Sequence, residues 1–148
     1  CNRMGIDALG IDSDQDNIDY CKRRGFKVQM GDFNNIELIK TIDSKKTNLL
    51  LFNNSLIYNG NILSLIKKIR KFFPLNSYIA IQDQNYFLNS RNPIKVLHSK
   101  KSGFMFSSPS LLRLFYHSSF EVINSRNYFG THFLLAKTTK NKKLYKIT

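Results

Sequence analysis

The alternation of strand-like and helix-like segments is the feature that most constrains the fold of this chain. Strand-like segments cover residues 8–11, 26–30, 48–52, 78–81, 120–124 and 131–137. Segments with apolar residues three or four positions apart, typical of helices, lie between most of them. This order predicts an α/β domain with a mostly parallel sheet. The last two strands have no helix between them, which predicts an antiparallel strand at one edge.

Local signals place the helix ends. Ser13 is the expected N-cap of the first helix, and Gly25 is its expected C-terminal stop. An amphipathic helix is predicted from residue 62 until Pro74 ends it. Ser108 followed by Pro109 predicts the start of the last helix, with proline at the first helical position. Residues 84–107 show no regular pattern.

Polar side chains follow the first three predicted strands. Asp12 closes the first strand, Asp32 follows the second, and Asn53 with Asn54 follows the third. Ligands of such sheets bind outside the carboxyl ends of the strands. A carboxylate there can accept from both hydroxyls of a ribose, and an aspartate at the next strand can accept from an adenine amino group. The competing interpretation is that each aspartate is an N-cap or turn residue.

The order of these segments resembles the class I, Rossmann-like S-adenosylmethionine-dependent methyltransferases, over nearly the whole chain. The motifs that carry the resemblance are Leu9-Gly10-Ile11-Asp12-Ser13, Ile18-Asp19-Tyr20, Gly31-Asp32-Phe33, Leu51-Phe52-Asn53-Asn54-Ser55-Leu56, Tyr78-Ile79-Ala80-Ile81-Gln82, Phe106-Ser107-Ser108-Pro109-Ser110-Leu111-Leu112 and Phe120-Glu121-Val122. The resemblance implies S-adenosyl-L-methionine as cofactor and a mostly parallel sheet with an antiparallel edge strand.

The resemblance also implies roles for the residues at the strand ends. Asp12 would bind the cofactor ribose, Asp32 and Phe33 the adenine, and Asn53 would lie near the methionine part. The expected cofactor-binding set is Asp12, Ser13, Asp32, Phe33, Asn53 and Asn54.

This sequence departs from the family at three places. The family's first strand and its glycine-rich loop would precede Cys1, so we expect a single domain over residues 1–148 that lacks its central strand and ends in a basic tail, 138–148. The strands around that position should then show a gap or pair directly, and the chain alone should aggregate and bind cofactor negligibly. Leu56-Ile57-Tyr58 replaces the family's acidic residue and histidine, and Pro74-Leu75-Asn76-Ser77 replaces its Pro-Gly-Gly turn.

Methyl transfer needs alignment more than protein chemistry, because the cofactor supplies the reactive group. A general base is required only where the acceptor must lose a proton. The candidates are His98 and Tyr58, with Asp83 and Tyr86 as further possibilities after the fourth strand. His117 and His132 are interpreted as a helix-end residue and a structural strand residue. No residues have the spacing of metal ligands, so no metal is expected.

The net charge of +13 is distributed unevenly. Residues 1–43 carry eight acidic and six basic side chains, whereas the remaining residues carry two acidic and seventeen basic ones. A basic surface can indicate a nucleic-acid partner. The high content of Lys, Asn and Ile (16, 16 and 15 residues) has a competing explanation, because these residues have AT-rich codons. We therefore expect a small-molecule methyl acceptor rather than a nucleic acid.

The remaining composition indicates a cytoplasmic protein without a membrane partner. The two cysteines cannot form a disulfide framework, and the apolar runs are too short to span a bilayer. The sequence does not indicate an oligomeric state or the acceptor atom. Two alternatives stay open: an RNA methyltransferase, and a degenerate methyltransferase-fold module that only binds.

Overall fold

The structure is a computed structural model that describes residues 4–33, 35, 38, 42, 47–84, 106–128 and 130–140. The chain divides into two compact units, Cys1–Thr41 and Ile42–Thr148. We call them unit 1 and unit 2 and describe each by itself.

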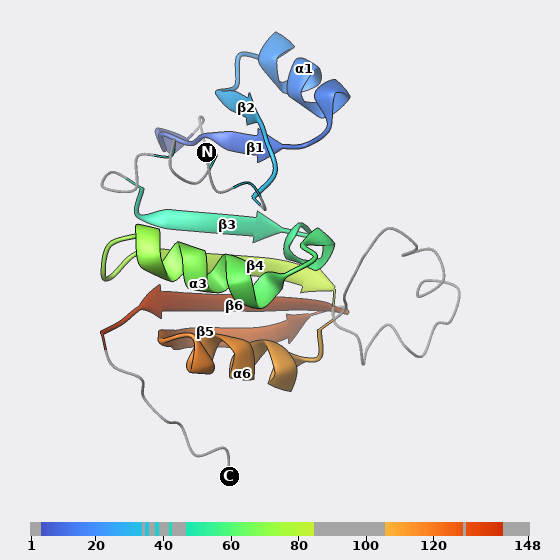
Figure 1. The fold of residues 1–148 in the computed structure, drawn as a ribbon. Coiled ribbons are helices and arrows are strands. Elements are labelled where there is room, and N and C mark those ends of the chain that lie inside the picture. The colour runs from blue at the N-terminus through green and yellow to red at the C-terminus, as the bar shows by residue number, and fades with distance from the viewer. Residues whose placement is uncertain are drawn as a thin grey trace. The chain divides into compact units, whose positions relative to one another are not determined.

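Unit 1 is a strand–helix–strand element (Figure 1). β1 (Gly10–Asp12) leads into α1 (Gln15–Arg23), and β2 (Val28–Met30) returns parallel to β1. Ile18 of α1 is 1% exposed, because the helix turns this apolar position inward and leaves its charged residues in solvent. The two short strands agree with the segments predicted around residues 8–11 and 26–30.

The two ends of α1 are fixed by an N-cap side chain and by a glycine. The N-cap is Asp14, whose side chain accepts from the amides of Asp16 and Asn17, so the prediction that Ser13 caps this helix is wrong by one residue. Asp14 has the advantage because a carboxylate also interacts favourably with the helix dipole. At the other end Gly25 adopts φ +75°, and the amides of Gly25 and Phe26 donate to the carbonyls of residues 22 and 21. This Schellman motif confirms the predicted glycine stop.

Unit 2 is built on a four-stranded mixed sheet in the order β3-β4-β6-β5. Its strands are β3 (Leu49–Asn53), β4 (Tyr78–Gln84), β5 (Phe120–Tyr128) and β6 (Thr131–Thr138). β3 and β4 are parallel, while β6 is antiparallel to both β4 and β5. The mixed α/β sheet confirms the predicted fold class. The antiparallel strand is β6, which lies between β4 and β5, so the edge position itself belongs to β5.

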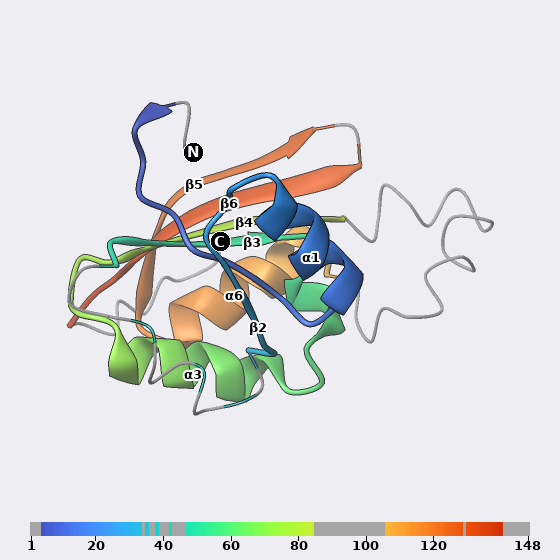
Figure 2. The ribbon, with the colours of Figure 1, turned by 90° about the horizontal axis from the view of Figure 1, so that it is seen from above.

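The helices of unit 2 cover one face of that sheet. They are the short 3₁₀ helix η2 (Leu56–Tyr58), α3 (Ile62–Phe72) and α6 (Ser108–His117). Figure 2 shows α3 and α6 on the same side of the sheet. The N-cap of α6 is Ser107, which accepts from the Ser110 amide; Ser108 is therefore already helical, one residue away from the predicted cap.

The core of unit 2 lies between the sheet and these two helices. Along β3 burial alternates strictly: Leu50 and Phe52 are buried, whereas Leu49 and Leu51 are 53% and 63% exposed. Side chains of a strand alternate between faces, so one face contacts α3 and α6 and the other keeps apolar residues in solvent. Within the described part of unit 2, the helices therefore cover one face of this sheet.

The strands β1 and β3 belong to different sheets. Of the two outcomes expected for strands on either side of a missing one, direct pairing is not observed. In the part of the chain that the structure describes, no helix is long and apolar enough to cross a membrane.

Candidate functional site

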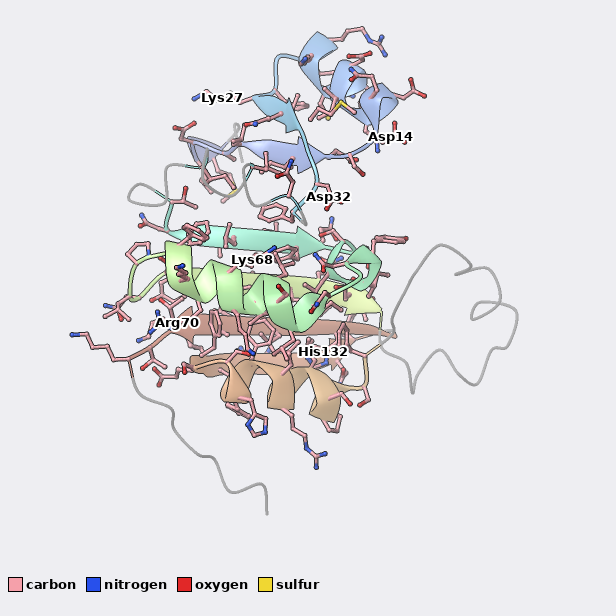
Figure 3. The ribbon with its side chains drawn as sticks, in the orientation of Figure 1. Asp14, Lys27, Asp32, Lys68, Arg70 and His132 are labelled. Carbon is pink, nitrogen blue, oxygen red and sulfur yellow. The ribbon has the colours of Figure 1, made fainter. Side chains whose placement is uncertain are left out.

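The acidic residues of unit 1 lie at the carboxyl ends of its two parallel strands. Asp12 is the last residue of β1 and pairs with Met30, and its carbonyl accepts from the Gly31 amide at 2.9 Å. Asp32 comes two residues after the end of the neighbouring strand β2 and is exposed (Figure 3). The structure therefore brings Asp12 and Asp32 to the same end of adjacent strands, as predicted.

Asp12 also has a local structural role. One carboxylate oxygen accepts from the Asp14 amide at 2.9 Å, and the other accepts from the Asn17 side-chain amide at 3.1 Å. These contacts fix the turn between β1 and α1, which is the role foreseen by the competing interpretation. Each carboxylate oxygen has two lone pairs, so each retains one further acceptor position. The half-buried Asp12 thus fits a vicinal diol while it holds the turn.

Gly31, the residue before Asp32, lies in close contact with Leu38. A Cβ on Gly31 would lie 2.7 and 2.8 Å from the two terminal methyl carbons of Leu38, which is buried. Glycine at this position therefore lets Leu38 pack against the strand end that presents Asp32. Phe33 is half-buried beside it, whereas Ser13 is exposed.

In unit 2 the predicted residues lie at the carboxyl end of β3. Asn53 is paired with Gln82 of β4, and the Asn54 amide donates to the Gln82 carbonyl at 2.7 Å. Asn54 adopts φ +49°, a left-handed conformation that asparagine tolerates better than most residues. Both side chains are exposed, and the Asn54 side-chain amide donates to the Asn53 oxygen at 3.4 Å. This strand end therefore offers amide donors and acceptors to a ligand.

The candidate bases have different outcomes. Tyr58 ends η2, shortly after Asn54, and is 57% exposed. His98 and Tyr86 lie outside the described residues. Asp83 was expected after the end of the fourth strand, but β4 continues to Gln84 and places Asp83 on the helix-covered face, where it is 1% exposed. The interpretation of Asp83 as a base open to substrate is corrected by this burial.

Asp83 is a buried acid whose side-chain oxygens accept no hydrogen bond from the residues that the structure describes. Burial raises its pKa to about 7, and the nearby backbone N–H of Leu56 lowers the pKa by less. The cause is desolvation, which disfavours a carboxylate in a site of low dielectric constant. The neutral acid is therefore a major form of Asp83 near neutral pH.

A buried histidine lies opposite this acid in the strand register. Asp83 of β4 pairs with His132 of β6, which in turn pairs with Asn127 of β5. The His132 Nδ1 atom lies 2.8 Å from the Ser108 hydroxyl and 2.9 Å from the Asn127 side-chain oxygen, and Nε2 lies 3.3 Å from the Ser125 hydroxyl. Burial lowers the His132 pKa. His132 is thus a structural strand residue, as predicted from the sequence.

Sequence reasoning did not place Asp83 and His132 together. The alternation Ile79, Ile81, Asp83 would have placed the acid on the buried face, had the strand been extended by two residues. The pairing with His132 depends on long-range register, for which the sequence holds no signal. No group of three or more potential metal ligands occurs within the described ranges.

Comparison with known proteins identifies the fold. No protein-family model matches the sequence, and no curated protein matches it. Among solved structures, the chain is similar to a SAM-dependent methyltransferase from Archaeoglobus fulgidus, with a TM-score of 0.73 and 14% identity over 93% of this chain and 79% of that one.

Two further structures agree. A SAM-dependent methyltransferase from Thermotoga maritima gives a TM-score of 0.70 at 15% identity, covering 93% of this chain and 75% of that chain. Another from Mesorhizobium loti gives 0.69 at 9% identity, covering 87% and 79%. The element order and these structural neighbours together show that the chain has the Rossmann-like fold of the class I S-adenosylmethionine-dependent methyltransferases.

Proposed function

We propose that this chain takes part in S-adenosylmethionine-dependent methyl transfer to a small-molecule acceptor. The observation that carries the proposal is the placement of Asp12 and Asp32 at the carboxyl ends of two adjacent parallel strands, in a chain with this fold. Ligands of open α/β sheets bind outside these strand ends.

The residues of unit 1 would hold the nucleoside part of the cofactor. Asp12 keeps one acceptor position on each carboxylate oxygen, which matches the two hydroxyls of a ribose. Asp32, exposed just beyond the end of the next strand, would accept from the adenine amino group, with the Phe33 ring packed against the base. Ser13 is exposed next to Asp12 and would line the same site.

The residues of unit 2 would act on the methionine part and the acceptor. When bound, the cofactor supplies a methyl group attached to a sulfonium. Asn53 and Asn54 would orient polar groups of the ligand through their side-chain amides, and the exposed Tyr58 hydroxyl would hydrogen-bond the acceptor or take its proton. His98 remains a candidate for the same task. The main contribution of the chain would be alignment, because the cofactor supplies the reactive group.

Cofactor binding is the first measurement, made by titration calorimetry of this chain with S-adenosylmethionine. Micromolar binding would support the cofactor assignment and contradict the expectation of negligible binding. No detectable binding would leave Asp12 and Asp32 without this ligand and would contradict the assignment.

The ribose assignment is tested by comparing the S-adenosylmethionine affinity of Asp12→Asn with that of the parent protein. This change keeps one oxygen for the Asp14 amide but removes the charge and the second acceptor. We expect cofactor affinity to fall by about 1.5–3 kcal/mol, the range for hydrogen bonds to a charged group, when measured by titration calorimetry. Asp32→Asn should cost less, because backbone and packing supply part of the adenine contact.

A matched control separates binding from folding. Asp14→Ala removes the N-cap two residues away, so it weakens α1 without touching the proposed ribose acceptor. Unchanged cofactor affinity in Asp12→Asn, or an equal loss in Asp14→Ala, would refute the assignment. Cofactor binding without turnover on any small molecule would instead favour the alternative of a module that only binds.

A further inference from the structure

The outward side of α3 carries lysines that have no acidic partner among the described residues of unit 2. Lys67, Lys68 and Lys71 line a shallow hollow of about 380 Å³ together with Asn61, Leu63 and Ser64. Figure 3 labels Lys68 on this helix. We call Asn61, Ser64, Lys67, Lys68 and Lys71 the α3 surface.

The helix has no acidic residue of its own. α1 of unit 1 is the ordinary case, with Asp16 in its first turn and Lys22 and Arg23 in its last. α3 has no acid in its first turn or anywhere else in its sequence, ILSLIKKIRKF. Surface helices usually mix both signs, because opposite charges three or four residues apart stabilise them. The charge of α3 therefore differs in kind from that of α1.

Helix stability explains only part of this charge. Arg70 and Lys71 lie in the last turn, where cations interact favourably with the helix dipole. Arg70 also donates to the Thr139 carbonyl at 2.6 Å. Lys67 and Lys68 lie before that turn and have no hydrogen bond or ion pair within the described residues. Like charges four residues apart, such as Lys67 and Lys71, destabilise a helix, so helix stability does not explain them.

The rest of unit 2 provides no described acid to neutralise the α3 surface. Its described carboxylates are Asp83, which is buried, and Glu121, which lies 3.6 Å from Lys137. The Asn61 side-chain oxygen accepts from the Ser64 amide at the first turn of α3, and Lys67, Lys68 and Lys71 lie along the later turns beside the same hollow. A row of cations of this kind suits a row of phosphates.

We propose that the α3 surface docks the phosphate backbone of a single-stranded RNA. The proposal is independent of the proposed methyl transfer, because it concerns binding and not the identity of the acceptor. RNA is favoured over a lipid surface because Leu63 is the only apolar member of the hollow, whereas a membrane-bound helix needs an apolar face to insert. Backbone contacts of this kind depend on salt and not on base sequence.

The experiment measures anisotropy of a fluorescein-labelled oligouridylate titrated with the full chain, at salt concentrations between about 50 and 200 mM. The test variant is Lys67→Gln with Lys68→Gln and Lys71→Gln, which keeps good helix formers at every position. We expect binding at low salt to weaken by about tenfold or more, and the slope of log affinity against log salt to fall by about 2.

Two controls isolate the α3 surface. Lys22→Gln with Arg23→Gln and Arg24→Gln removes the same charge from α1, and this variant should bind like the parent protein. The variant Lys67→Arg with Lys68→Arg and Lys71→Arg should retain binding. Circular dichroism checks that each variant is folded.

Three outcomes would overturn the proposal. The parent chain could fail to bind the oligouridylate at low salt. The α1 variant could lose as much affinity as the α3 variant, which would show that the net charge acts without a specific surface. The third outcome is binding to vesicles that contain anionic lipid, with no binding to the oligouridylate.

Discussion

Unit 1 and unit 2 differ in how much apolar surface they bury and in which proposed binding residues they carry. Nearly all the buried apolar side chains belong to unit 2, and unit 1 contributes Ile18 and Leu38 alone among the described core residues. Both units expose large apolar side chains, among them Met4, Leu9 and Met30 in unit 1 and Leu51 in unit 2, but in unit 1 few buried ones accompany them. Yet the aspartates proposed to hold the cofactor lie in unit 1. Unit 2, which is well packed, therefore supplies the scaffold. The proposed nucleoside contacts depend on unit 1, which has few buried apolar side chains.

The largest expected effect comes from making the same isoleucine-to-alanine change once in each unit. Ile69 in unit 2 and Ile18 in unit 1 are 0% and 1% exposed, so each Ile→Ala change removes the same buried atoms. We expect Ile69→Ala to cost about 4–5 kcal/mol and Ile18→Ala about 2 kcal/mol, because the cost depends on how far the surroundings can relax. The free energy of unfolding is measured by urea titration, with amide hydrogen exchange used to monitor each unit separately. Equal costs would remove the distinction between the units.

The second prediction concerns the pH dependence of the stability of unit 2, which contains the buried Asp83. The folded-state pKa of Asp83 is raised from 3.8 to about 7, so between these values the folded state binds the proton more strongly than the unfolded state. Stability should therefore be greatest at low pH and fall as pH rises from about 4 to 7, by at most about 4 kcal/mol from this residue. His132 acts in the opposite sense, since its lowered pKa costs stability below about pH 6.5.

Asp83→Asn removes the ionisation and isolates this contribution. The stability of the variant relative to the parent should increase with pH from about 4 to 7 and then stay constant. Urea midpoints at several pH values measure it, and His132→Gln in the same series separates the histidine contribution. A difference between Asp83→Asn and the parent that does not change with pH would show that Asp83 is not the titrating group.

The smallest effect concerns the strand end that presents Asp32. Gly31→Ala would place a methyl group 2.7 Å from a Leu38 methyl carbon, so Leu38 must move. We expect a cost of about 1–2 kcal/mol, seen as faster hydrogen exchange in unit 1 with unit 2 unchanged. Gly60→Ala is the control, since a Cβ there meets nothing within 4 Å. A loss of protection in unit 2 with Gly31→Ala would show that the units unfold together.

Sequence reasoning recovered the order of the elements because each carries its own local signal. The glycine at residue 25 and the proline at residue 74 placed helix ends well, since their backbone limits are steric and need no partner. The N-caps were each placed one residue away, because Ser13 competes with Asp14, and Ser108 with Ser107, for equivalent roles. Only the folded backbone decides between two adjacent capping residues.

The candidate site was predicted in part for the same reason. Asp12 and Asp32 were placed correctly at adjacent strand ends, because parallel pairing follows from the strand–helix–strand order. Asp83 was misjudged, because the length of β4 depends on its pairing with β6 about fifty residues later. Long-range register decides such burial, and a single sequence does not encode it in a readable form.

The place of β6 in the sheet has a consequence for synthesis of the chain. β6 is the last described strand, yet it lies between β4 and β5 and pairs with both. As the polypeptide leaves the ribosome, the backbone N–H and C=O groups along one edge of β4 have no strand to pair with until residues 131–138 emerge. Only then can the four-stranded sheet form. A nascent chain stalled before this point would hold the parallel pair β3–β4 without its central neighbour, so it is the natural target for chaperones that recognise open strands.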